Sequence, residues 1–152
     1  MNDAAQANLK LAGMLQATGS ASGFTSRQLQ EFADSLSRST NFTETSIKQA
    51  MSILMTFRGV TGDVFTRAIE LSADYAKLTG GDVATAARMF GRALEDPVNG
   101  LGALRRALGA VHPEQKKYIE DLVAAGRLED ARAELLKMLD QTVEKTPTKI
   151  DD

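Results

Sequence analysis

The sequence contains no cysteine and no tryptophan, and its 152 residues include one histidine, His112. The absence of cysteine excludes disulfides, thiolate metal sites and cysteine nucleophiles. A lone histidine also has no obvious partners for a zinc site. We therefore expect no metal and no cofactor. We interpret His112, which lies just before Pro113, as a helix N-cap or loop residue rather than as a general base.

The chain also has no excess of positive charge and no long apolar run. Lys and Arg number 18 and Asp and Glu number 20, which gives a net charge of −2. A general nucleic-acid binder needs a clustered excess of basic residues, so that class is excluded. No apolar run approaches the roughly 20 residues that span a bilayer. The first residues lack a basic segment followed by an apolar one, so no signal peptide is predicted.

The residues that are present repeat with helical periodicity along the whole chain, and neither strand alternation nor hairpin turns occur. Side chains that can cap a helix mark most of the starts, and glycine or proline marks most of the stops. The predicted starts lie at Thr25, at Thr43 or Thr45, at Asp82, at Asp96-Pro97 and at His112-Pro113. The sequence therefore predicts an all-α fold, a bundle of about eight short helices in antiparallel hairpins.

Each predicted helix carries an apolar stripe that should face the core. In the first helix, over residues 3–18, we place Leu9, Ala12 and Leu15 on this stripe. Later stripes are Leu29, Phe32, Ala33 and Leu36; Ile47, Ala50, Met51, Leu54 and Phe57; Val64, Phe65, Ala68, Ile69 and Ala76; Val83, Ala86, Ala87, Phe90 and Leu94; Leu101, Leu104 and Leu108; Ile119, Leu122 and Val123; and Leu128, Ala131, Leu135, Met138 and Leu139.

The small residues Ser20-Ala21-Ser22-Gly23 form the best linker in the chain. They divide it into an N-terminal helix over residues 1–19, expected to be loosely attached, and a helical domain over residues 20–145. A polar tail follows at 146–152.

Few residues offer chemistry. Adjacent carboxylates occur three times, but neighbours on a helix point about 100° apart, and they fit caps and first turns better than acid–base catalysis. These pairs are Glu95-Asp96, Glu120-Asp121 and Glu129-Asp130. Gly80-Gly81 follows no strand, so it is no phosphate-binding loop. Four arginines could form a basic patch for DNA or an acidic partner, although a solvated face is favoured: Arg88, Arg92, Arg105 and Arg106. We expect no catalytic, cofactor-binding or metal-binding residue.

One ordered series of motifs over residues 22–140 resembles a recurring segment of the tail tape-measure proteins of phages and prophages. The strongest part is the run from Gly91 to Leu101, Gly-Arg-Ala-Leu-Glu-Asp-Pro-Val-Asn-Gly-Leu. Other parts are Ser22-Gly23-Phe24-Thr25, Phe32-Ala33-Asp34-Ser35-Leu36, Ser39-Thr40-Asn41-Phe42, Leu54-Met55-Thr56-Phe57, Gly62-Asp63-Val64-Phe65, Ala103-Leu104-Arg105-Arg106, Glu114-Gln115-Lys116-Lys117 and Leu122-Val123-Ala124-Ala125-Gly126. Gly109-Ala110-Val111-His112-Pro113 departs from the usual pattern, so the turn there should differ.

The resemblance implies a structural role in the phage tail. Similar proteins lie extended in the tail tube, where the length of the helical chain sets tail length. The implied partners are the tail tube protein, tail assembly chaperones and further copies of the chain. No small-molecule substrate and no specific nucleic acid are implied. The implied location is the virion tail, after synthesis in the bacterial host cytoplasm. Such proteins usually have many hundreds of residues, so 152 residues would be one piece.

Two other functions remain open at this stage. The chain could be a helical adaptor that binds a partner helix in a groove lined by Met51, Leu54 and Met55. It could also be an enzyme with Glu95 or Glu114 as an acid, which would require a deep polar cleft around either residue.

Overall fold

The computed structural model describes residues 3–17, 23–109 and 111–145. Within these ranges the protein has helices and no strand, so the all-α prediction is confirmed. The helices are α1 (Asp3–Ala17), α2 (Ser26–Ser39), α3 (Glu44–Leu54), α4 (Gly62–Thr79), α5 (Val83–Glu95), α6 (Pro97–Leu108), α7 (Pro113–Ala124) and α8 (Leu128–Lys145). The predicted polar tail 146–152 and linker positions 20–22 lie outside the described residues. The proposed division into 1–19 and 20–145 stays a prediction.

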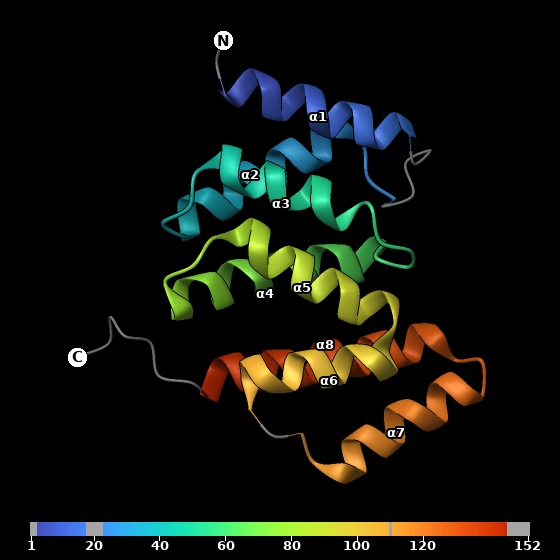
Figure 1. The fold of residues 1–152 in the computed structure, drawn as a ribbon. Coiled ribbons are helices and arrows are strands. Elements are labelled where there is room, and N and C mark those ends of the chain that lie inside the picture. Colours follow the sequence, from blue (N-terminus) through green and yellow to red (C-terminus); the bar gives the residue numbers. More distant parts are fainter. Residues whose placement is uncertain (1–2, 18–22, 110, 146–152) are drawn as a thin grey trace.

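The helices are arranged in layers (Figure 1). Helix α1 lies at one end on α3, and the pair α2–α3 lies on the pair α4–α5. Helix α5 then packs on α6, and α7 closes the far end against α6 and α8. Helix α8 also returns to contact α4, so it joins the last layers to the middle of the molecule. None of the described helices is long and apolar enough to cross a membrane.

Helix starts follow the capping residues that the sequence predicts. The Thr25 hydroxyl accepts a hydrogen bond from the Gln28 backbone N–H at 3.2 Å, and the Gln28 side chain accepts one from the Thr25 N–H at 2.9 Å. This reciprocal pair confirms the predicted capping box. Thr43, not Thr45, caps α3. Asp82 caps α5 by accepting from the backbone N–H three residues on, at 2.7 Å.

The core is aliphatic with two buried phenylalanines, as the composition requires. Its largest fully buried side chains come from seven of the eight helices: Phe65, Phe90, Leu11, Leu29, Ile47, Met51, Leu54, Ile69, Leu71, Leu94, Ile119 and Leu135. The predicted stripes of α2 to α8 therefore supply most of the core. At roughly 1.5–3 kcal/mol for each fully buried aliphatic or aromatic side chain, this burial is the main stabilising term.

The predicted stripe of α1 is wrong at Leu9. Leu9 is 70% exposed, whereas Ala7 and Leu11 are buried. The side chains of Ala12 and Leu15 lie outside the described residues. The error has a physical cause: apolar residues lie on several sides of this helix, so periodicity alone does not select one face.

Candidate functional site

The motif with the strongest family resemblance, residues 91–101, forms the corner between α5 and α6. Two of its glycines allow close packing. A Cβ on Gly91 would lie 2.9 Å from the Cγ of Phe57, and one on Gly100 would lie 2.8 Å from the Cβ and the carbonyl oxygen of Ala93. Real Cβ atoms show almost no contacts this short, so neither position has room for a side chain. Packing therefore requires glycine at Gly100, where the contact is with the backbone of Ala93, whereas a side chain at Gly91 would force the Phe57 ring to move.

The acidic residues of the same corner are hydrogen-bond acceptors. Glu95 Oε2 accepts from the backbone N–H of Arg58 at 2.8 Å and so holds the α3–α4 loop against the end of α5. Asp96 accepts from both the backbone N–H and the side-chain amide of Asn99, at 3.4 and 2.7 Å. Asp96 thus caps α6 ahead of Pro97, as predicted. Both carboxylates have structural partners, but only Asp96 is a cap, as predicted; Glu95 holds a loop instead.

A buried arginine completes the corner, and the sequence did not predict it. Arg132 on α8 is 5% exposed. Its Nε donates to the Leu94 carbonyl at 2.8 Å, and its Nη1 donates to Glu129 at 2.7 Å. The guanidinium lies against Gly59, whose φ of +80° and missing side chain leave the necessary space. A cation at the last turn of α5 donates to a carbonyl that has no partner within the helix, and its charge interacts favourably with the negative end of the helix dipole.

The remaining acidic pairs form surface contacts. Asp121 pairs with Lys117 at 3.1 Å on α7, and Asp130 pairs with Arg127 at 2.8 Å at the start of α8. All four of these side chains are more than half exposed, so each pair contributes roughly 0–1 kcal/mol. Within the described ranges, no group of three or more His, Cys, Asp or Glu side chains comes together to hold a metal ion.

His112 lies at the N-cap position of α7 and makes no side-chain capping bond there. It is exposed and lines a crevice of about 190 Å³ whose apolar floor includes Leu101, Leu104 and Leu135. Small-molecule sites usually enclose roughly 300–1,000 Å³. The crevice is therefore small for a substrate. Glu114, the other candidate acid, is exposed in the first turn of α7.

The adaptor groove predicted at Met51, Leu54 and Met55 does not exist as an open surface. Met51 and Leu54 are fully buried, and Met55 is 6% exposed. All three belong to the main core cluster. The prediction was wrong because an apolar helix stripe looks the same in sequence whether it lines a groove or faces a core.

The predicted basic patch is described only in part. Arg88 and Arg92 lie one turn apart on α5 and both are exposed. The side chains of Arg105 and Arg106 lie outside the described residues.

Among the described residues, two carboxylates have shifted pKa values. Burial raises the pKa of Asp74 on α4 above its ordinary value of 3.8, against the opposing effect of Arg67, and Asp140 on α8 adds to the rise. Hydrogen bonds from Thr85 lower the pKa of Asp82, the N-cap of α5. The first shift disfavours the ionised form in the folded protein, and the second favours it.

These observations define a class of protein. It is an all-helical structural module whose described polar side chains serve mainly as caps, ion pairs and corner contacts. The model of the prophage tail length tape measure protein family matches residues 2–120, which is most of the chain. The chain belongs to this family, and its role is that of a structural component of a phage tail. Searches of curated proteins and of solved structures found no match.

Proposed function

We propose that the chain is a helical segment of a tail tape measure, that it helps to determine tail length and to assemble the tail, and that it has no catalytic activity. The family match over residues 2–120 carries this proposal. The packing at the α5–α6 corner supports it, because four residues of the strongest motif have contacts that shape the fold. Gly91 and Gly100 allow close packing, Glu95 holds the α3–α4 loop against α5, and Asp96 caps α6.

The proposed partners are the tail tube protein, the tail assembly chaperones and further copies of the chain, with synthesis in the host cytoplasm before assembly. Family membership supports contact with other tail proteins in general. Purified chain should therefore retain the tube protein or a chaperone of the same tail in a pull-down. If it retains neither, the proposed partners are wrong.

Tail length is the direct test of the ruler role. If this segment lies extended as helix in the tail, each residue adds about 1.5 Å. In-frame removal of residues 2–120 from the phage gene should then shorten the tail by about 180 Å, and duplication of the same segment should lengthen it equally. Electron microscopy of purified virions measures both changes. Tails of unchanged length in the two variants would overturn the proposal.

A substitution that disturbs the fold without changing chain length is the matched control. Gly100→Ala forces a side chain against Ala93 but leaves the number of residues constant. We expect fewer virions from this variant, each with a tail of normal length. Shortened tails from Gly100→Ala would mean that the folded module, not the chain length, sets the measured distance.

A further inference from the structure

A groove crosses three helices, α2, α4 and α8, which lie in successive layers (Figure 1). Between α4 and α8 it is a hollow of about 510 Å³, and between α2 and α4 it is a hollow of about 370 Å³. Thr66 on α4 lines both hollows, so they adjoin. We call this surface the α2–α4–α8 groove and define it by Thr66 and by the apolar side chains Phe24, Phe32, Val64, Ala133 and Leu136.

The groove is lined by apolar side chains that water can reach. Phe24, Phe32 and Val64 are half-buried against the core. Ala133 is exposed. The centroid of the Phe24 ring lies 6.1 Å from that of the Phe65 ring, so Phe24 is held in place. An apolar hollow between helices accepts the side chains of a further helix, because the ridges of one helix pack into the grooves between others.

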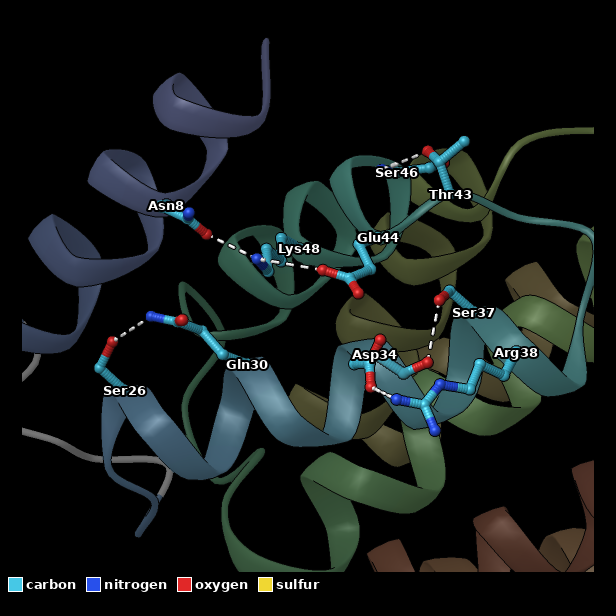
Figure 2. Close-up of polar contacts among 10 residues, drawn as sticks. All are labelled: Asn8, Ser26, Gln30, Asp34, Ser37, Arg38, Thr43, Glu44, Ser46 and Lys48. Atoms are coloured by element: carbon cyan, nitrogen blue, oxygen red, sulfur yellow. Dashed lines mark hydrogen bonds and ion pairs between the residues drawn. The ribbon is translucent and has the colours of Figure 1, made fainter. Parts of the chain in front are cut away.

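Charged side chains of the neighbouring helices α2 and α3 find partners within the chain. On α3, Lys48 is 5% exposed and its Nζ donates to Asn8 Oδ1 at 2.6 Å (Figure 2). The carboxylate of Glu44 lies 3.6 Å from the same Nζ. On α2, Arg38 pairs with Asp34 (Figure 2). The fold itself supplies the partners of these charges, so they give no sign of a binding site.

Two charges in the groove differ from these. Arg67 on α4 pairs with Asp140 on α8 across the groove. Asp63 on α4 and Lys137 on α8 are exposed and line the same hollow, but neither forms an ion pair with a described residue. The groove therefore presents one unpaired carboxylate and one unpaired ammonium group beside its apolar lining.

We propose that the α2–α4–α8 groove binds an amphipathic helix of another tail protein. Apolar side chains of that helix cover the groove, and one basic and one acidic side chain on it pair with Asp63 and Lys137. The charges select this occupant. A helix with charges of one sign would place like charges together, and a helix without charges would cover Asp63 and Lys137 without pairing them. The inference rests on the contact with other tail proteins in the proposed function and gives that contact a surface.

A synthetic helical peptide tests the groove directly. Its apolar stripe consists of leucines, with one lysine and one glutamate at the edges, and fluorescence anisotropy measures its affinity for the full chain. Ala133→Gln puts a polar side chain into the groove without changing any charge, and it should weaken binding about fivefold or more. Ala5→Gln, at an exposed position of α1, is the matched control and should leave the affinity unchanged. Equal affinities for the two variants, or no binding by the unchanged chain, would overturn the proposal.

Charge reversal tests the pairing with Asp63 and Lys137. Asp63→Lys and Lys137→Glu should each weaken binding of the same peptide about fivefold, because one attraction becomes a repulsion. The double variant again has one charge of each sign, and the peptide can bind it in the opposite direction, so the affinity should recover. A role of these charges in stability alone predicts no such recovery. Single variants that bind as tightly as the unchanged chain, or a double variant without recovery, would show that the assigned pairing is wrong.

Analytical ultracentrifugation of the chain alone distinguishes a second copy from another protein. A dimer that Ala133→Gln dissociates would make a second copy the occupant and overturn the proposal. In the phage gene, Ala133→Gln should lower the yield of virions and Ala5→Gln should not, and equal yields would contradict a role of the groove in assembly. Failure of these tests together with shortened tails after segment removal would refute the groove and leave the ruler role intact.

Discussion

Two glycines of α6 that look equivalent in the sequence should respond in opposite ways to alanine. A Cβ on Gly100 would lie 2.8 Å from Ala93 Cβ and closer still to Ala93 Cα, and the backbone of α5 cannot move aside cheaply. Overpacking of this kind costs roughly 1–3 kcal/mol or more, while replacing a helical glycine by alanine gains roughly 0.5–1 kcal/mol. We expect Gly100→Ala to lower the free energy of unfolding by about 1–2 kcal/mol on balance.

Gly102 is the matched control, because a Cβ there meets no atom within 4 Å. Gly102→Ala should keep only the gain of roughly 0.5–1 kcal/mol. For a chain of this size, 1 kcal/mol shifts the melting temperature by roughly 2–4 °C, so the variants should differ by several degrees in opposite directions. Thermal unfolding followed by far-ultraviolet circular dichroism measures this. Equal melting temperatures for Gly100→Ala and Gly102→Ala would refute the close contact between α5 and α6.

Three other side chains, Arg132, Asp82 and Asp74, give further predictions about stability. Arg132→Ala should lower the free energy of unfolding, measured by urea denaturation, by about 2–3 kcal/mol, because it leaves the Leu94 carbonyl without its donor. Arg127→Ala, which removes an exposed ion pair, should lower it by less than about 1 kcal/mol. Equal losses for the two variants would contradict the buried role of Arg132. Asp82→Ala should cost about 1 kcal/mol at neutral pH. Because the folded-state pKa of Asp82 is lowered, this loss should shrink as pH falls below 3.8, and a loss that is constant with pH would be inconsistent with a charged cap. The folded-state pKa of Asp74 is raised, so its ionisation costs stability as pH rises through that pKa. Asp74→Asn should therefore stabilise the protein at neutral pH and lose this advantage below 3.8; no gain at neutral pH would contradict the shift.

Local signals in the sequence were sufficient to predict where most of the helices begin. The cap at Asp82 acts over three residues, so sequence reasoning located it and the structure agrees. The capping box at Thr25 succeeded for the same reason. Helix α1 shows where local reasoning fails. It has no clear polar side, so whether Leu9 or Leu11 is buried depends on its packing against α3, which is distant in sequence.

The contacts of the candidate site depend on partners far along the chain. Arg132 finds its acceptor 38 residues away, and Lys48 finds Asn8 at a separation of 40. A lone Arg or Lys in a helical pattern is normally a surface residue, so nothing local marked these two as buried. Nothing local distinguishes the two glycines of α6 either. Gly100 packs on Ala93, whereas Gly102 has open space around it.

The return of α8 to α4 has a mechanical consequence. Most layers contact only the next layer, so tension on the two ends of the chain could remove them one at a time. The contact between α4 and α8 interrupts this order. Because the last helix, α8, packs on α4, the helices α4 to α8 form one unit. Stretching should therefore release α1 first and the α2–α3 pair next. The unit α4–α8 should resist longest and then yield in a single larger step.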